Sequence, residues 1–273
     1  MKHLIKGLRQ VRNVVILFLS LLGLTLMMLF GSPWLALRSQ FMKPEDRQAY
    51  VRRAITVGYR RYFTSLHYLG VFELDLTDID RLQGEPGLIL TSNHPSLFDA
   101  LLIISRLPNV VCIMKAQVLR NPMFGHGAGM AGYIPNDSIR TIVSDAEREL
   151  KEVGSQLLLF PEGTRSLRKR LNPFQGTVGL IARKTGCPVQ TIFIESDSGF
   201  LGKGWPFWKA PAFPVRIRVR AGKRFTQVED SKLFIAELKD YYEQELGTRR
   251  APVAQETAEE IDVVTDDPTV KQP

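Results

Sequence analysis

The longest apolar stretch of the chain lies near its N-terminus. Twenty-five residues without a charge separate Arg12 from Arg38. As one helix rising 1.5 Å per residue, this stretch would be about 37 Å long, more than the ~30 Å hydrocarbon core of a bilayer. It is too long for a secretory signal peptide, and no A-x-A cleavage site follows it. We therefore predict a retained membrane anchor over residues 1–42.

Two features leave the path of this anchor open. Basic residues lie on both sides of it, so the positive-inside rule decides little; they are Lys2, Lys6, Arg9 and Arg12 before it and Arg38, Lys43, Arg47, Arg52 and Arg53 after it. Gly31-Ser32-Pro33 can break a helix and turn the chain back, because glycine bends freely and proline lacks a donor. The anchor is either a span or a re-entrant hairpin.

The remaining chain alternates between helix and strand patterns. Residues 43–67 predict a basic amphipathic helix. Short strands are predicted at 71–76, 87–91, 110–114, 156–160, 188–194 and 214–220, with helices at 97–107 and 138–153 among them. This alternation predicts an α/β fold: a single domain over residues 43–247 with a largely parallel mixed sheet flanked by helices. Residues 248–273 are acidic and lack aromatic side chains, which predicts a disordered tail.

The net charge limits the classes of binding partner, and the cysteines indicate the redox compartment. The formal net charge is +8, and residues 1–60 alone contribute ten basic and two acidic groups. A basic collar beside an apolar segment suits an anionic membrane surface or an acidic carrier protein. Nucleic acid is excluded as a partner because no nucleic-acid-binding motif accompanies the charge. Cys112 and Cys187 lie in apolar runs and are predicted to be buried free thiols, as in a reducing cytoplasm.

Two polar clusters each follow a predicted strand. His94 comes after the strand at 87–91, and Asp99 falls in the first turns of a helix that Pro95 is expected to start. The stretch "FPEGTRS" (160–166) follows the strand at 156–160 in the same way. Ligands of open α/β sheets bind beyond the carboxyl ends of the strands. We therefore expect both clusters to open onto one site.

The residue types in these clusters fit base catalysis on an anionic substrate. A neutral histidine takes a proton from a hydroxyl, while an aspartate on its other nitrogen fixes the tautomer. Arg165 can clamp a phosphate or carboxylate, and Gly163 lets the backbone approach closely. No serine or cysteine is spaced to act as a nucleophile, which argues against an esterase. Each cluster alone is more often an ordinary loop, and only their combination favours catalysis.

The two clusters resemble the signatures of a known family. "NHPSLFD" (93–99) resembles the N-H-x4-D block of the glycerolipid acyltransferases of the 1-acyl-glycerol-3-phosphate acyltransferase type, and "FPEGTRS" is similar to their second signature. The resemblance covers about residues 60–225. It implies that His94 is a general base and Asp99 its partner. It also implies that Lys115 supplies a second cation. The implied residues that bind the acceptor are Glu162, Gly163, Thr164 and Arg165.

The resemblance also implies a reaction and a location. A fatty acyl group would pass from acyl-CoA or an acyl carrier protein thioester (acyl-ACP) to the hydroxyl of a lysophospholipid such as 1-acyl-glycerol-3-phosphate. The implied partners are the phospholipid membrane, the lysolipid acceptor and the thioester carrier. No metal or redox cofactor is implied. Acyl thioesters are cytoplasmic, so the catalytic domain is expected on the cytoplasmic face of the inner membrane.

Two departures from the family pattern bear on the acceptor. "GYIPND" (132–137) lacks the arginine usual in the intermediate block, and Thr191 stands where the fourth block usually has a second proline. Another acceptor, such as a lyso-ornithine lipid or a specialised lipid, therefore stays open. The alternative from another class is a non-catalytic lipid-binding protein of the membrane surface, which would not need a paired His94 and Asp99.

One further segment stands out by composition. "FLGKGWPFWKAPAFP" (200–214) gathers two tryptophans, three phenylalanines and two lysines among prolines. Ordinary surface packing is one interpretation, since scattered exposed apolar residues are normal. The other is a loop that dips into a membrane interface, where tryptophan and lysine are favoured.

Overall fold

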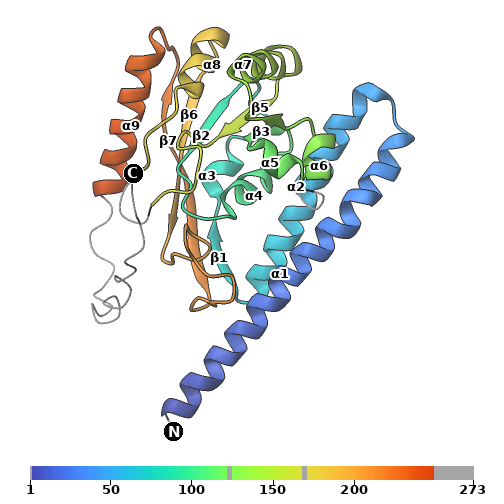
Figure 1. The fold of residues 1–273 in the computed structure, drawn as a ribbon, viewed down its shortest axis with the longest axis vertical. Coiled ribbons are helices and arrows are strands. Elements are labelled where there is room, and N and C mark those ends of the chain that lie inside the picture. The colour runs from blue at the N-terminus through green and yellow to red at the C-terminus, as the bar shows by residue number, and fades with distance from the viewer. Residues whose placement is uncertain (1, 122–124, 168–170, 249–273) are drawn as a thin grey trace, which may run out of the picture.

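The computed structural model describes residues 2–121, 125–167 and 171–248, and the predicted acidic tail falls outside these ranges beyond Thr248. Two long helices, α1 (Lys2–Gln40) and α2 (Pro44–Tyr68), form an antiparallel pair beside a sheet domain (Figure 1). By length and composition, Lys6–Gln40 is a candidate membrane span. The predicted basic helix at 43–67 matches α2.

A seven-stranded sheet with the order β1-β7-β6-β2-β5-β3-β4 forms the centre of the domain. The strands are β1 (Phe72–Asp75), β2 (Ile89–Ser92), β3 (Val110–Met114), β4 (Ile134–Pro135), β5 (Gln156–Leu159), β6 (Val189–Ser196) and β7 (Val215–Phe225). Among the strands described, only the β6–β7 pair is antiparallel. The predicted α/β fold with a largely parallel mixed sheet is confirmed. Every residue of β2 and β5 is buried, as expected for central parallel strands covered on both faces.

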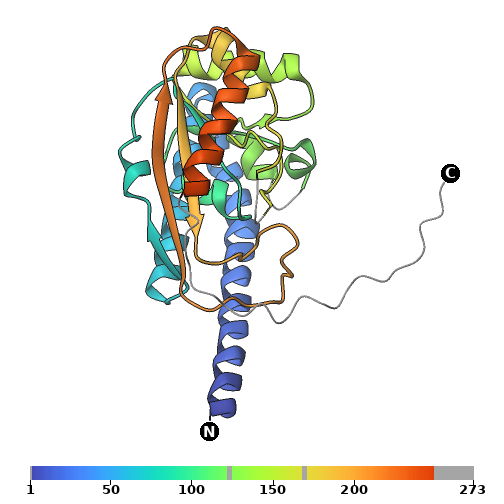
Figure 2. The same cartoon turned by 90° about the vertical axis from the view of Figure 1, so that its left-hand side faces the viewer.

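Helices cover both faces of this sheet. The shorter helices are α3 (Thr77–Asp80), α4 (Asp99–Ile104), α5 (Ala116–Leu119), α6 (Gly125–Met130), α7 (Ile139–Arg148) with a π-helical turn (Glu149–Val153), α8 (Thr177–Thr185) and α9 (Ser231–Thr248). Helix α9 lies on one side of the sheet, and α1, α2 and α4 lie on the other (Figure 2). The sheet thus separates α9 from the long helix pair.

Helix α1 differs from one of its two predicted paths. It continues through Gly31-Ser32-Pro33, so the re-entrant turn expected there does not form, and the chain turns back only at 41–43. Proline inside a helix removes a backbone hydrogen bond, at a cost of about 3 kcal/mol. Burial of Leu17, Leu24 and Met28 along one side of α1 offsets this cost. The helix packs against the domain along that side.

Helix α4 also begins later than predicted. It starts at Asp99, and Pro95 precedes it in an irregular turn. The Ser96 hydroxyl donates to the Phe200 carbonyl at 3.0 Å, and the Leu97 N–H donates to the Leu201 carbonyl at 3.2 Å. Because the loop after β6 satisfies these groups, the turn does not need helical hydrogen bonds.

Candidate active site

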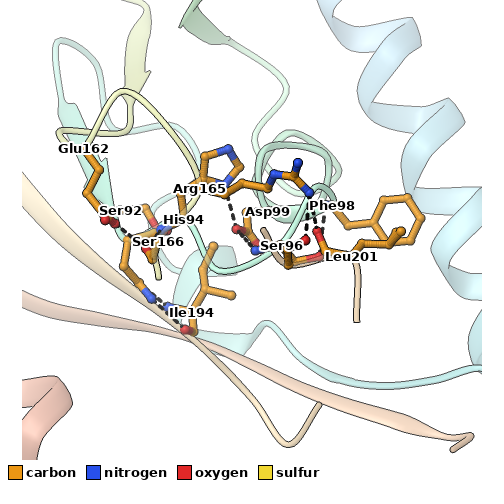
Figure 3. A network of polar contacts seen from close by, with 12 residues as sticks. Ser92, His94, Ser96, Phe98, Asp99, Glu162, Arg165, Ser166, Ile194 and Leu201 are labelled. Carbon is orange, nitrogen blue, oxygen red and sulfur yellow. Dashed lines mark hydrogen bonds and ion pairs between the residues drawn. The ribbon is translucent and has the colours of Figure 1, made fainter. Parts of the chain in front are cut away.

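The two motif loops lie side by side because their strands do. Strands β2 and β5 are adjacent and parallel, so His94 after β2 and residues 160–166 after β5 share one edge of the sheet. The Ser166 N–H donates to the His94 carbonyl at 2.7 Å, and the His94 N–H donates to Ser166 Oγ at 3.0 Å (Figure 3). The prediction that both motifs open onto one site is confirmed in its geometry.

His94 and Asp99 form a hydrogen-bonded pair. His94 Nδ1 lies 2.8 Å from Asp99 Oδ2, and the Ser96 N–H donates to the same oxygen at 2.7 Å. The imidazole stacks on the Phe160 ring with centroids 4.1 Å apart, which fixes its plane. A carboxylate can only accept, so Nδ1 carries the proton and Nε2 is the basic nitrogen. The His94 side chain is 19% exposed and lines a cavity.

Asp99 is fully buried, and only one of its two carboxylate oxygens accepts hydrogen bonds from residues that the structure describes. Within the described ranges, Oδ1 has no hydrogen-bond partner. Burial raises the pKa of Asp99, although the hydrogen bond and charge of His94 and the Ser96 N–H oppose the shift. Burying Oδ1 without a hydrogen bond from the described residues opposes folding.

Glu162 braces the second loop from inside the protein. Its carboxylate accepts hydrogen bonds from the Ser166 hydroxyl and from both the N–H (2.7 Å) and the side-chain amide (2.8 Å) of Asn172. Ser166 in turn bonds the backbone of His94. The structure therefore places Glu162 beside the pair through Ser166, with both carboxylate oxygens already occupied, and its expected contact with an acceptor stays a prediction.

The other expected substrate-binding residues meet at the cavity. Arg165, Gly163, Thr164 and Lys115 all line it together with His94. Arg165 Nη1 donates to the carbonyls of Leu201 (2.8 Å) and Gly202 (3.0 Å), which leaves its other N–H groups for a ligand.

The conformation at Gly163 explains its residue type. Its φ is +63°, in the left-handed region, and an added Cβ would come within 2.2 Å of the Gln175 amide nitrogen.

The cavity itself is large and mainly apolar. Its volume is about 1410 Å³, beyond the ~300–1,000 Å³ of sites for drug-sized ligands. Much of its wall comes from apolar residues of α1, α2 and α4, including Leu24, Met28, Ile55 and Leu101. Arg53 and Arg61 of α2 add two cations, and no carboxylate lines the cavity among the described residues. The cavity suits a ligand that joins a long apolar part to an anionic group.

Sequence reasoning missed three residues of the site, two that line the cavity and one that lies next to His94. Arg53 and Arg61 were assigned only to a basic helix, because the face of α2 that meets the cavity depends on tertiary packing. Asn93 was also missed: its amide donates to the Ile194 carbonyl at 2.9 Å and its Oδ1 accepts from the Ile194 N–H at 2.8 Å. An asparagine directly after a buried strand was the available signal for this link to β6.

The cysteines differ from each other. Cys112 is buried and Cys187 is half-buried, so burial is confirmed for the first thiol only; both are free. Burial raises the pKa of the Cys112 thiol to about 12. No group of three or more metal-ligating side chains occurs in the part of the chain that the structure describes.

Comparisons with known proteins identify the domain. Residues 73–195 match the family model described as Acyltransferase. The chain is 31% identical over 144 residues to chloroplastic 1-acyl-sn-glycerol-3-phosphate acyltransferase BAT2 of Brassica napus, covering 50% of this chain and 42% of that protein. It is 25% identical over 202 residues to chloroplastic 1-acyl-sn-glycerol-3-phosphate acyltransferase LPAT1 of Arabidopsis thaliana, covering 72% and 54%. The chain thus spans about half the length of these curated relatives.

A solved structure supports the same assignment at the level of the fold. The crystal structure of PlsC, the 1-acyl-sn-glycerophosphate acyltransferase of Thermotoga maritima, superposes with a TM-score of 0.69 at 21% identity. The match covers 89% of this chain and 100% of that one. The motif-based assignment is confirmed by the match of residues 73–195 to the family model described as Acyltransferase.

Proposed function

We propose that this protein is a membrane-bound acyltransferase that moves a fatty acyl group from acyl-CoA or acyl-ACP to the hydroxyl of a lysophospholipid such as 1-acyl-glycerol-3-phosphate. One observation carries the proposal: the His94–Asp99 pair lies at a large apolar cavity that Arg165 also lines. The activities named for the relatives support the same choice of acceptor.

The pair would act on the acceptor hydroxyl. His94 Nε2 takes the hydroxyl proton as the oxygen attacks the thioester carbonyl carbon. The tetrahedral intermediate then collapses, the C–S bond breaks, and the proton on Nε2 passes to the departing thiolate. Asp99 holds the imidazole and stabilises its transient positive charge. General-base catalysis of this kind contributes about 10²–10⁴-fold to the rate.

The charges around the cavity favour a phosphorylated acceptor. Arg165, Lys115, Arg53 and Arg61 line it, with no carboxylate among its described lining residues. An arginine fork binds phosphate oxygens in pairs, and a lysine adds a point charge. The apolar walls from α1 and α2 would take the acyl chains.

Helix α1 would hold the domain at the membrane. One side of it packs on the domain through Leu17, Leu24 and Met28, while Phe18, Phe30 and other apolar residues are exposed. The exposed apolar side would lie in the lipid while the opposite side stays packed on the domain. This position keeps the cavity on the cytoplasmic face, where acyl thioesters occur, without requiring α1 to cross the bilayer.

An acceptor panel tests this proposal. Purified protein is given acyl-CoA or acyl-ACP with 1-acyl-glycerol-3-phosphate, monoacylglycerol or a lyso-ornithine lipid. We expect transfer to the phosphorylated acceptor, and for Arg165→Lys a KM about tenfold higher, equivalent to the loss of about 1.4 kcal/mol of binding. Transfer restricted to lyso-ornithine lipid would assign the other acceptor, and lipid binding with no transfer to any acceptor would support a non-catalytic lipid-binding protein.

A further inference from the structure

The loop that follows β6 exposes large aromatic side chains. We refer to residues 202–209 as the tryptophan loop. Within it Trp208 is 80% exposed and Phe207 is 57% exposed, and Lys203 and Lys209 are also exposed. Phe207 and Trp208 are adjacent in sequence and form one small exposed apolar patch, with a lysine on each side of it in the sequence.

The tryptophan loop has a defined conformation. The Trp205 indole N–H donates to the Lys209 carbonyl at 2.8 Å, which closes the loop. The Lys209 ammonium lies 5.4 Å from the centre of the Trp205 ring. Trp205 also packs edge-on against buried Phe200. These contacts hold Trp205 inward, while the adjacent Phe207 and Trp208 remain outside.

The tryptophan loop lies beside the apolar helix. The Asn13 side-chain amide of α1 donates to the Pro211 carbonyl at 3.1 Å, just beyond the loop. Figures 1 and 2 both place this segment next to the N-terminal half of α1. Asn13 precedes the apolar run of α1, whose Val14, Val15 and Phe18 are exposed. The exposed aromatic residues of the loop therefore lie near the exposed apolar residues of the candidate membrane helix.

The tryptophan loop also borders the cavity. Phe207 lines the cavity together with α1 residues and Arg165. At the start of the loop, the Leu201 and Gly202 carbonyls accept the hydrogen bonds of Arg165. A molecule that reaches the cavity along α1 would therefore pass the loop on its way to Arg165.

We propose that the tryptophan loop inserts into the headgroup region of an anionic lipid bilayer and forms, with α1, the rim over which the lipid acceptor enters the cavity. Tryptophan favours the boundary between headgroups and acyl chains, and lysines beside it are attracted to anionic lipids. The entry route rests on the proposed function, whereas the insertion is tested without activity.

Quenching by brominated lipids tests the insertion. The probe is the protein with Trp208 as its sole tryptophan (Trp34→Phe, Trp205→Phe) on vesicles of equal parts phosphatidylglycerol and phosphatidylcholine, brominated near the headgroup end of the chains. We expect loss of about half of the fluorescence, as for an interfacial tryptophan. The control is Leu233→Trp in a background with all three native tryptophans replaced by Phe. This site is 72% exposed on α9, and the sheet separates α9 from α1 (Figures 1 and 2).

Both proteins keep α1, so both reach the vesicle. Quenching of Trp208 no stronger than that of the Leu233→Trp control would overturn the proposal. A second comparison uses two proteins that both retain Trp205 and therefore the Trp205–Lys209 hydrogen bond, one with Trp208 and one with Trp208→Phe. The difference in quenching between them is the contribution of Trp208.

Kinetics test the entry route separately. Trp208→Ser should raise the apparent KM for an acceptor carried in vesicles by about fivefold, since interfacial anchoring by one aromatic side chain is lost. The rate with a dispersed short-chain acceptor should stay unchanged. An equal change with both acceptors would contradict the entry route, and absence of transfer in the wild type would refute the proposed function while the quenching result still decides the insertion.

Discussion

At the scale of single residues, Asp99 shows a conflict between stability and chemistry. Burial raises the pKa of its carboxyl above the ordinary value of about 3.9. The folded state therefore binds more protons than the unfolded state, and stability falls as pH rises from the unfolded toward the folded pKa. Above the folded pKa, the buried charge is retained at a cost to the free energy of unfolding.

Replacing this carboxylate separates the two roles. Asp99→Asn keeps an oxygen that can accept from Ser96 and removes the buried charge, so we expect a melting temperature at pH 7 equal to or above that of the wild type. Acyl transfer should fall by about 10²–10⁴-fold because a neutral amide no longer stabilises the positive charge that forms on the imidazole. Melting curves at pH 5 and 8 with parallel assays measure both, and Asp240→Asn on the exposed surface of α9 serves as the control. A drop of several degrees in the melting temperature would contradict the claim that burying the Asp99 charge destabilises the fold.

The residues of the site were predictable where their pattern is local. His94 and Asp99 lie five positions apart and follow a strand, so spacing and strand order place them together. Arg53 and Arg61 contribute from a helix distant in sequence, and no local pattern marks their face. The contacts of Glu162 depend on Asn172, which the loop brings back only in the folded state.

At the scale of elements, Asn93 joins two strands at the site. Its side chain pairs with both the N–H and the carbonyl of Ile194, as a neighbouring strand would. Asn93→Ala leaves both buried groups without a partner, at about 1–3 kcal/mol for each. We expect the free energy of unfolding to fall by about 2–6 kcal/mol. Urea denaturation measures this, Gln83→Ala on the surface is the control, and an unchanged midpoint would refute the role of Asn93.

Strands were more predictable than helix ends in this chain. The predicted strand at 110–114 coincides with β3, because a buried parallel strand is continuously apolar. The start of α4 was wrong because the turn at Ser96 and Leu97 bonds Phe200 and Leu201, about a hundred positions away. Of the two alternatives left open at Gly31-Ser32-Pro33, the helix break does not form, because packing on the domain stabilises the helix more than one lost hydrogen bond weakens it.

At the scale of the whole molecule, α1 combines a packed side with an exposed apolar side. The α/β fold was predictable from alternating patterns, but the cavity between α1, α2 and the sheet was not, because it depends on how the long helices dock. The exposed side carries Phe18, Leu22 and Phe30. Apolar contact with lipid is insensitive to salt, whereas attraction of basic residues to anionic lipid is screened within ~3 Å at 1 M salt.

Membrane extraction tests which force dominates. We expect the protein to stay with the membrane fraction through a wash in about 1 M salt and to leave it in detergent, because apolar burial outlasts screening. The triple variant Phe18→Ser/Leu22→Ser/Phe30→Ser should shift protein into the soluble fraction, while Leu233→Ser on α9 should not. Release of most wild-type protein by salt alone would show that charge, and not the apolar face, holds it.

The most direct measurement is acyl transfer to 1-acyl-glycerol-3-phosphate by wild type and His94→Ala, with circular dichroism confirming that both fold. The account predicts a fall of about 10²–10⁴-fold in kcat with little change in KM, since His94 acts on the proton and not on the phosphate. His67→Ala, at an exposed histidine outside the site, should transfer at the wild-type rate. Transfer by folded His94→Ala at the wild-type rate would contradict the general-base role and with it the mechanism.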